Sequence, residues 1–331
     1  MYGISNDTQD YLDIVRLAAL KRPLVAFYKG VQEILCRRMP ARSMYVAMLE
    51  GNDKLRFPYF VDEVETEDLL KVYPKRGVTG YVVDTKRWAW LGRDPGLVER
   101  AGRFGPLPSD WIGIPLVDRS GEVYGVLGVQ TYEAGSSYTD SDRDFLEFAA
   151  SQISFAIQFK RIDQDLAIDR IAALVDETTD LDDLYTGIHR IVADLIPSAE
   201  RNFIIARIDE KAGLFRPVYW RDEKGECDGM AWPLDHGMCS YICRVTRSSF
   251  IYEHGRTTPP SEILSMGTPP RFWLGAPLFS GKDIVGVVVT QSYEAGEPIA
   301  LDDEAALVSV CPHIAQAIGR TEFFELTYRS V

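Results

Sequence analysis

Apolar and polar positions follow helical spacing in some segments and alternate in others, and their order predicts the fold class. The first half of the chain reads as two helices, a β-hairpin, a short helix, a short strand, a second hairpin and a long helix. These segments are residues 6–20, 24–39, 43–63, 77–85, 87–91, 111–129 and 139–175. Because strands follow strands, we expect a mostly antiparallel sheet with helices on its faces, an α+β arrangement.

The long helical pattern has a consequence for assembly. Thr139 or Asp140 can cap the helix, and at about 1.5 Å per residue it would span roughly 50 Å, more than one small domain needs. Its apolar residues keep a spacing of three or four, with a break near Lys160 and Arg161. They are Leu146, Ala150, Ile153, Ile157, Leu166, Ile171 and Leu174. Exposed on a monomer, such a stripe would be unusually large, so it predicts a homodimer built on helices.

The second half of the chain repeats the first. QTYEAG at residues 130–135 returns as QSYEAG at 291–296, and the apolar segments on either side recur in the same order. A new helix, capped near Thr179 or Asp180, opens the second copy. A repeat of about 150 residues is the size of an independently folding domain. We expect an N-terminal helix (1–22), a first domain (23–160), a connecting helix (161–178), a second domain (179–320) and a C-terminal exit helix (321–331).

Composition narrows the class of protein. The chain has 331 residues, 46% of them hydrophobic and 26% charged, with a formal net charge of −13. That charge argues against a general nucleic-acid or anionic-membrane surface. No apolar run is long enough for a membrane span, and the N-terminus has no secretory signal. Five scattered cysteines give no disulfide framework, which indicates a cytoplasmic setting. They are Cys36, Cys227, Cys239, Cys243 and Cys311.

Both copies resemble GAF domains of bacterial signalling proteins. The resemblance is carried by WIGIPL…GVLGVQTYEAGSSYTDSDRDFLEFAASQISFAI from residue 111 and by WLGAPL…GVVVTQSYEAGEPIALDDEAALVSVCPHIAQAI from residue 273. It implies two domains of PAS-like fold that bind a small molecule or dimerise and regulate an attached output. Sensor regions of diguanylate cyclases and histidine kinases are similar, and the ending FFELTYRSV looks like the lead-in to a diguanylate cyclase domain.

Three branches of that family fit less well. Thr131-Tyr132 and Ser292-Tyr293 stand where cyclic-nucleotide-binding GAF domains carry an Asn-Lys pair. The Cys-His dipeptide usual in bilin-binding members is absent. Free methionine sulfoxide reductases are single GAF domains with reactive cysteines; the first domain has only Cys36, whereas the second has more than one. A small thiol-dependent reductase in the second domain therefore stays open as an alternative.

Aromatic residues are the richest candidate chemistry in each domain. Aromatic walls with a few polar groups suit a small-molecule pocket, and they equally suit the core of a small sheet domain. Arg76 and His236 occupy equivalent positions beside these walls, and Arg76 should favour an anionic ligand. The candidate ligand-binding residues are Tyr59, Phe60, Arg76, Thr79, Tyr81, Trp88, Trp90, Trp220, Trp232, His236, Cys239, Tyr241, Cys243 and Tyr252.

The helix starting near His236 carries the most concentrated polar chemistry. His236, Cys239 and Cys243 share one helical face, opposite an apolar face that includes Tyr241 and Val245. Imidazole and thiolate are soft ligands, so a metal or haem site is one interpretation. The other, which we favour, makes the cysteines small apolar side chains and His236 a helix cap, and it requires no cofactor.

Signatures of catalysis are otherwise absent from the sequence, which contains no GxxxxGK[ST], GxSxG, HExxH or GxGxxG motif. The sequence therefore predicts a non-catalytic sensory module of tandem GAF domains, with a small-molecule ligand of unknown identity and a signalling output in cis or trans. A structural dimerisation module without a ligand is a further alternative.

Overall fold

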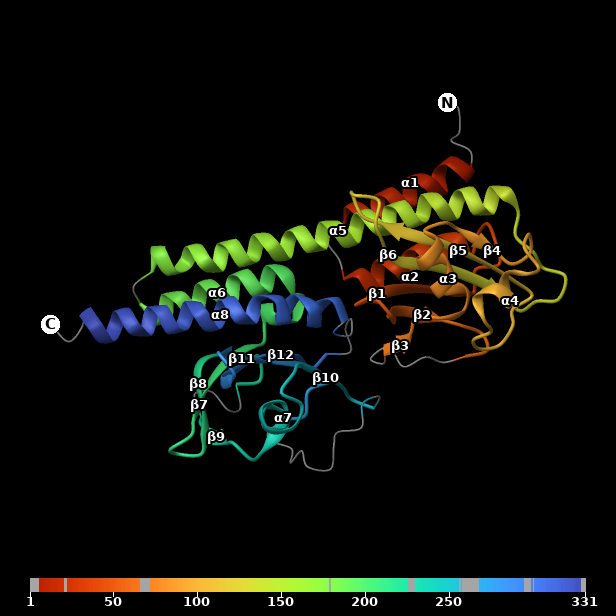
Figure 1. Cartoon of the computed structure of the whole chain (residues 1–331). Coiled ribbons are helices and arrows are strands. Elements are labelled where there is room, and N and C mark those ends of the chain that lie inside the picture. Colours follow the sequence, from red (N-terminus) through yellow and green to blue (C-terminus); the bar gives the residue numbers. More distant parts are fainter. Residues whose placement is uncertain are drawn as a thin grey trace. The chain divides into compact units, whose positions relative to one another are not determined.

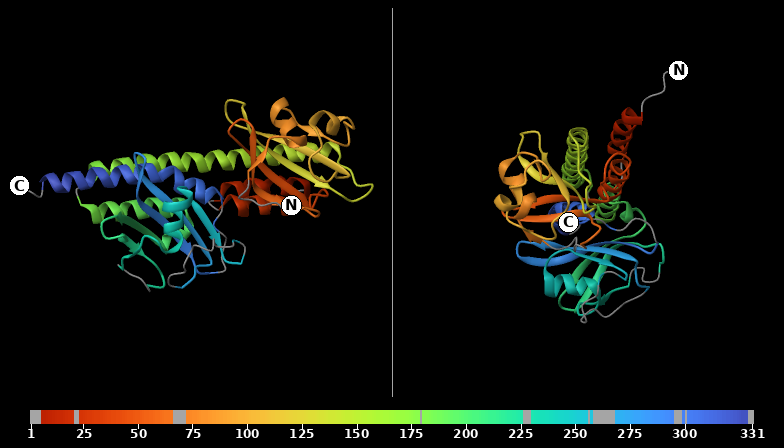
Figure 2. Two further views of the ribbon diagram at one scale, coloured as in Figure 1. Left: turned by 60° about the horizontal axis from the view of Figure 1, so that its bottom comes forward. Right: turned by 90° about the vertical axis from the view of Figure 1, so that its right-hand side faces the viewer.

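The computed structural model describes residues 6–20, 23–65, 72–178, 180–225, 230–255, 257, 268–294, 299 and 301–328. The chain divides into two units, Met1–Lys160 and Arg161–Val331. Helix α5 (Asp140–Glu177) begins in the first unit and continues as one helix into the second (Figures 1 and 2). The predicted break near Lys160 is thus a change of unit and not a break in the helix.

The first unit is built on a six-stranded sheet in the order β3-β2-β1-β6-β5-β4, and every described strand pairing is antiparallel. The strands are β1 (Ser43–Glu50), β2 (Lys54–Val61), β3 (Val72–Pro74), β4 (Ala89–Trp90), β5 (Asp110–Val117) and β6 (Val123–Thr131). The helices before α5 are α1 (Asn6–Ala19), α2 (Leu24–Leu35), α3 (Gly77–Thr85) and α4 (Leu97–Ala101). Pro58 lies where the register of β1 and β2 shifts, which is a place where a strand tolerates proline.

Each face of this sheet has its own core. Met44 and Val46 point toward α1, α2 and the first half of α5, whereas their neighbours Tyr45 and Ala47 point toward α3. This alternation is the period of two that a strand imposes. The helix-packed core is the larger and contains Phe27, Tyr28 and Phe145 among its buried side chains. The candidate site lies on the other face.

The second unit repeats this topology. Its sheet order, β9-β8-β7-β12-β11-β10, matches that of the first unit strand for strand, again with antiparallel pairing throughout the described residues (Figure 1). The strands are β7 (Phe203–Asp209), β8 (Leu214–Arg221), β9 (Trp232–Pro233), β10 (Phe250–Glu253), β11 (Phe272–Ser280) and β12 (Asp283–Ser292). The other elements are α6 (Leu181–Leu195), the 3-10 turn Pro197–Glu200, α7 (Gly237–Tyr241), the π-helical turn Ile242–Thr246 and α8 (Leu301–Tyr328).

The capping prediction at the start of α6 is confirmed for Asp180. The side chain of Asp180 accepts hydrogen bonds from the backbone N–H groups of Asp182 (2.8 Å) and Asp183 (3.4 Å), so it caps α6. The other predicted cap, Thr179, lies outside the described residues, as do the last three residues of the predicted exit helix.

The apolar stripe predicted on the long helix serves the two units' own cores. Leu146, Ala150, Ile153 and Ile157 are buried in the first unit, and Ile171 is buried in the second, with Leu174 packed against it. Of the predicted stripe only Leu166 is exposed, at 54%. The argument for a dimer from the exposure of this stripe is therefore wrong, because intrachain packing covers it.

A buried polar contact links the pre-strand helix to the sheet in each unit. In the first unit the Tyr59 hydroxyl donates to Gln32 Oε1, and Gln32 Nε2 donates to the carbonyl oxygens of Ala41 (3.1 Å) and Arg42 (2.9 Å). Gln32 thereby connects α2, the following loop and β2.

Histidine replaces glutamine at this place in the second unit. His189 Nδ1 lies 2.7 Å from the hydroxyl of Tyr219, which corresponds to Tyr59, and Nε2 lies 2.8 Å from the carbonyl oxygen of Ala199. A carbonyl only accepts, so Nε2 carries the proton and Nδ1 accepts from Tyr219. Burial lowers the pKa of His189; Arg221 adds to the lowering, and the bond to Ala199 opposes it.

This histidine predicts an acid-sensitive second unit. In the unfolded chain His189 takes up a proton as the pH falls below about 6.5. In the folded chain its lowered pKa delays this protonation to a lower pH. The free energy of unfolding should therefore fall as the pH falls below about 6.5. His189→Gln should remove this part of the pH dependence, and the reciprocal Gln32→His should introduce one in the first unit. Urea unfolding at pH 7.5 and 5.5 measures both. The same pH dependence in wild type and His189→Gln would contradict the assignment.

Candidate functional site

The repeated hexapeptide forms a polar clamp at one end of each sheet. In the first unit Gln130 Nε2 donates to the carboxylate of Asp62 and to the hydroxyl of Tyr132 (3.0 Å), and Tyr132 donates to Asp62 (3.4 Å). The other carboxylate oxygen of Asp62 accepts the backbone N–H groups of Val64 and Glu65. Burial, and then the negative charge of Asp62, raise the pKa of Tyr132.

The second unit carries the same clamp. Gln291 donates to Asp222 and to Tyr293 (2.8 Å), Tyr293 donates to Asp222 (3.0 Å), and Asp222 caps the turn at Lys224 (2.8 Å). The glutamine and the tyrosine, the first and third residues of the hexapeptide, thus fix the chain after β2 and β8 to the adjoining end of the sheet. The same structural contacts in both units explain why the hexapeptide is repeated, and they require no ligand.

Aromatic side chains fill the α3 face of the first unit. Tyr45 lies at their centre, with ring centroids 5.5 Å from Phe57 and 6.0 Å from Phe60. Its hydroxyl accepts from Trp111 Nε1 (2.9 Å) and lies 2.7 Å from Thr79 Oγ1. The Tyr45 ring covers Gly128 so closely that a Cβ there would lie 2.1 Å from it. This face is packed and its buried polar groups are paired.

The structure does not bring the first unit's candidate residues together. Phe60, Thr79 and Tyr81 lie on the α3 face. Tyr59 and Trp90 are buried in the helix-packed core on the opposite face, because they follow the other phase of the strand alternation. Trp88, which is 38% exposed, lies near Arg143, and Arg76 is exposed.

Helix α3 turns the candidate residue Thr79 toward the sheet and not toward an open site. Thr79 and Val83 are buried, whereas Thr85 is exposed. The small Thr79 faces the sheet because the large Tyr45 rises from it there. Arg76 precedes the helix and stacks on Phe104, with its guanidinium carbon 4.4 Å from the ring centroid.

A buried carboxylate and a surface network fix the start of α5. Asp110 accepts N–H bonds from the Trp90 side chain and from the backbone of Gly92 (2.8 Å), Trp111 (2.7 Å) and Tyr138 (3.0 Å). Asp110 is 1% exposed, so these four donors replace its water. The loop after β4 and the approach to α5 are thereby held to the same end of β5.

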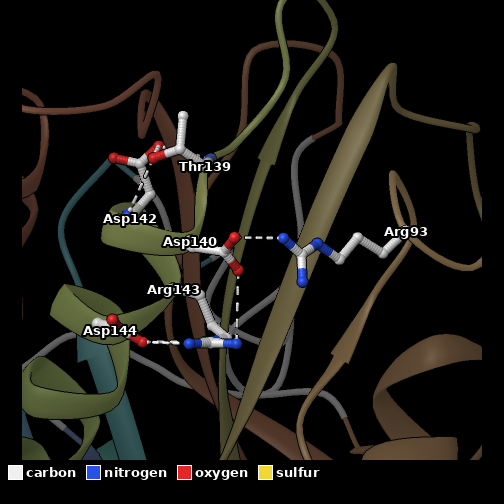
Figure 3. A network of polar contacts seen from close by, with 6 residues as sticks. All are labelled: Arg93, Thr139, Asp140, Asp142, Arg143 and Asp144. Carbon is white, nitrogen blue, oxygen red and sulfur yellow. Dashed lines mark hydrogen bonds and ion pairs between the residues drawn. The ribbon is translucent and has the colours of Figure 1, made fainter.

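Figure 3 shows the ion pairs outside this carboxylate. Arg93, from the loop after β4, pairs with Asp140, and Arg143 contacts both Asp140 (3.5 Å) and Asp144. Thr139 Oγ1 accepts the N–H of Asp142 (3.2 Å), and the Asp142 carboxylate accepts the N–H of Thr139 (2.8 Å). This reciprocal capping confirms Thr139 as the predicted cap, with the acidic cluster in a structural role.

The equivalent face of the second unit differs in one polar group. Ile204 pairs with Trp220 as Tyr45 pairs with Phe60, so no hydroxyl stands there. Trp232 stacks on Phe215 (5.5 Å between centroids) and meets Trp220 edge-on (6.1 Å). Trp220 Nε1 is buried and has no hydrogen-bond partner among the described residues. Leaving a buried N–H unpaired costs about 1–3 kcal/mol, so this donor calls for an acceptor.

Helix α7 agrees with the small apolar role favoured for Cys239 but corrects the predicted core face of the helix. Cys239 is only 9% exposed and belongs to the core, with Ile242 fully buried beside it, whereas Val245 is 54% exposed. The second unit has one residue more than the first between this helix and the next strand, and the extra residue forms the π-helical turn. That turn rotates the later residues, which helical spacing alone cannot predict.

The remaining candidates of the second unit lie near the ends of this face. His236 precedes α7, but its side chain does not cap the helix as predicted. It makes no hydrogen bond to the helix start, because Nδ1 lies 2.6 Å from the carboxylate of Asp235 instead. Tyr241 packs edge-on against Phe250 (5.1 Å), and the Tyr252 hydroxyl lies 3.1 Å from His254 Nδ1.

The thiols of this unit are poorly suited to nucleophilic chemistry. Burial raises the pKa of Cys239, with Cys243 adding to the effect, and burial raises the pKa of Cys243 to about 12. Because the thiolate is the reactive form, a raised pKa suppresses reactivity. Cys227 lies outside the described residues. Within the described ranges no three His, Cys, Asp or Glu side chains gather as a metal site, and no helix has the length and apolar character of a membrane span.

Comparison with known proteins identifies the fold of the first unit. Residues 22–158, which lie within the first unit, match the family model described as GAF domain. Mixed α and β structure, two antiparallel six-stranded sheets flanked by helices and the long helix α5 confirm the predicted fold class. The comparison with curated proteins gave no match.

Similar solved structures are distant in sequence. The GAF domain of an Acinetobacter phosphoenolpyruvate-protein phosphotransferase is 16% identical, with 48% of this chain and 97% of that chain covered and a TM-score of 0.40. The corresponding Coxiella burnetii domain is 13% identical, with 51% and 98% covered and a TM-score of 0.40. Free methionine-R-sulfoxide reductase from Neisseria meningitidis, solved with its substrate, is 12% identical, with 48% and 90% covered and a TM-score of 0.39.

The raised thiol pKa values predict slow modification of the native second unit. A pKa of about 12 leaves about one thiol in ten thousand ionised at pH 8, so Cys243, and Cys239 still more, should react slowly until the unit unfolds. Ellman's reagent at pH 8, with and without urea, measures this on a Cys227→Ser variant, and mass spectrometry locates the label. Exposed Cys36 is the internal control and should react first. Rapid labelling of Cys239 in the native protein would contradict the assignment.

Proposed function

We propose that the chain is a non-catalytic sensory and regulatory module of two GAF-type units, of which the second binds a small molecule. The GAF match of residues 22–158 supports the first unit's assignment. The identical strand order and the repeated clamp support the second unit's. The observation that carries the ligand proposal is the buried, unpartnered Trp220 Nε1.

The surroundings of Trp220 favour a flat ligand with a hydrogen-bond acceptor. Trp220 and Trp232 lie edge to face, and Phe215 continues the apolar surface. Aromatic walls with few polar groups suit stacking on a planar molecule. A ligand acceptor near Trp220 Nε1 would satisfy the donor that the protein leaves unpaired. Cys239, Cys243 and Tyr252 belong to the same packed face and would shape the site without reacting.

The first unit fits a structural role better than a ligand-binding one. Tyr45 and its aromatic neighbours occupy the equivalent face, and the Tyr45 hydroxyl pairs with Trp111 and Thr79. A ligand of this unit would meet Arg76 at the surface, where its fixed positive charge favours an anion. For the first unit we therefore favour the alternative of a structural dimerisation module without a ligand. We do not favour it for the second unit.

A thiol-dependent reductase is the competing function. Free methionine-R-sulfoxide reductase is among the similar folds. The raised pKa values of Cys239 and Cys243 weigh against reactive thiols in the second unit, and the absence of a three-residue metal group within the described ranges gives no support to a metal or haem site.

The regulatory role requires an output and a partner. We place the module in the cytoplasm, acting as a homodimer on a signalling domain in cis or trans, such as a diguanylate cyclase. The scattered cysteines support the cytoplasmic setting. Helix α5, shared by the two units, is the element through which ligand binding would act.

Trp220→Phe tests the ligand proposal. Losing the N–H while keeping an aromatic ring should weaken binding roughly 5- to 100-fold, the usual worth of a buried hydrogen bond. Native mass spectrometry of freshly purified wild type should find a small-molecule adduct that the variant retains poorly. Saturation-transfer NMR with purine, pteridine and flavin probes extends the search.

The matched control is Phe60→Leu, at the position of the first unit that corresponds to Trp220. It should leave ligand retention unchanged. Equal retention by wild type and Trp220→Phe, or no binding of any probe, would count against a ligand site in the second unit.

A further inference from the structure

The part of the first unit that carries helices α3 and α4 is basic, although the chain as a whole is acidic. Between residues 75 and 109 the sequence holds seven Lys and Arg side chains against three Asp and Glu side chains, a net charge of +4 in a chain of net charge −13. A surface of this sign attracts acidic partners and repels basic ones. The basic residues are Lys75, Arg76, Lys86, Arg87, Arg93, Arg100 and Arg103.

Three of these arginines keep their charge available. Arg76, Arg87 and Arg103 are exposed, and none of them forms an ion pair with a carboxylate among the residues that the structure describes. The other four basic residues are neutralised within the unit. Their ion pairs are Lys75–Asp84, Lys86–Glu122, Arg93–Asp140 and Arg100–Asp94.

Exposed apolar side chains accompany two of the available arginines. Helix α4 packs against α3, and the loop after α4 returns beside the start of α3 (Figure 1). In that loop Phe104 is 43% exposed and Leu107 is 53% exposed. Phe104 lies against Gly77, where a Cβ would come within 3.0 Å of the Phe104 Cβ. We call Arg76, Arg103, Phe104 and Leu107 the α3–α4 patch.

The aromatic ring prepares Arg76 for a carboxylate. The guanidinium carbon of Arg76 lies 4.4 Å from the centroid of the Phe104 ring. A guanidinium held over a ring keeps N–H donors at its edge, and that edge matches the two oxygens of a carboxylate. Because the contact already restricts the long side chain, less conformational entropy is lost when a partner binds.

One carboxylate limits the kind of anion that the patch accepts. Glu65 approaches the same loop, with Oε2 3.1 Å from the place that a Cβ on Gly105 would occupy. A dense polyanion such as a nucleic acid would be repelled there and by the net charge of the chain. A segment with few carboxylates around an apolar side chain suits the patch better.

We propose that the α3–α4 patch docks an acidic segment of a partner protein. An apolar side chain of that segment contacts Phe104 and Leu107, and flanking carboxylates pair with Arg76 and Arg103. Charge complementarity selects this occupant, and the apolar contact adds buried area. The proposal gives the first unit a protein-binding role, and it does not depend on a ligand in the second unit.

Fluorescence anisotropy of the full chain with a labelled synthetic peptide tests the proposal. The probe carries two leucines flanked by glutamates, and its control carries glutamines in place of the glutamates. The glutamate peptide should bind more tightly than the control, and added salt should weaken it. Equal binding of the two peptides, or no binding of the glutamate peptide, would overturn the proposal. So would preferential binding of a single-stranded oligonucleotide, which would assign the patch to nucleic acid.

Arginine variants test whether the peptide binds at the patch. Arg76→Ala and Arg103→Ala should each weaken the glutamate peptide about three- to tenfold, as expected for a partly exposed ion pair. The matched control is Arg87→Ala, which removes the same charge beyond the far end of α3 and should leave the affinity unchanged. Circular dichroism checks that each variant is folded. Equal weakening by all three variants would reveal an effect of net charge alone and would overturn the site.

Photocross-linking maps the contact independently of any substitution. A benzophenone side chain replaces one leucine of the glutamate peptide, and protease digestion with mass spectrometry locates the cross-link. Label within residues 100–109 is the expected result. Label only in other segments of the chain would contradict the α3–α4 patch as the docking surface.

Discussion

Alternation of side chains across the pleat of each six-stranded sheet is the constraint on which both units depend. Tyr59 and Phe60 are neighbours in sequence, yet one joins the helix-packed core and the other the α3 face. The same rule separates Tyr219 from Trp220 in the second unit. Every candidate site residue on a strand is therefore assigned to a face by its phase along the strand, before any question of ligand chemistry arises.

The α3 face of the first unit and the equivalent α7 face of the second unit differ in whether their buried polar groups have hydrogen-bond partners. The first unit places a tyrosine at the centre of its α3 face, and that hydroxyl meets Trp111 and Thr79. The second unit places Ile204 there, and a tryptophan N–H remains without an acceptor among the described residues. Since buried donors are normally paired, this asymmetry supports a ligand role for the second unit and a structural role for the first.

Helix α5 combines the demands of both units. One side completes the core of the first unit and then that of the second, while the Asp110 carboxylate and the Arg93–Asp140 pair anchor its beginning.

The sequence by itself determined the α+β class, the repeated architecture, the long helix and the caps at Thr139 and Asp180, because these follow from local periodicity and local hydrogen bonding. Only the tertiary structure decided which sides of α3 and α7 face the sheet, since Tyr45 and a one-residue π-helical turn fix that choice from outside the helices. It alone showed that Gln32 and His189 occupy the same place in the two units. It also showed that the apolar stripe of α5 is buried except at Leu166. Helical spacing marks a residue as apolar-facing, but packing between distant segments determines which apolar face is covered.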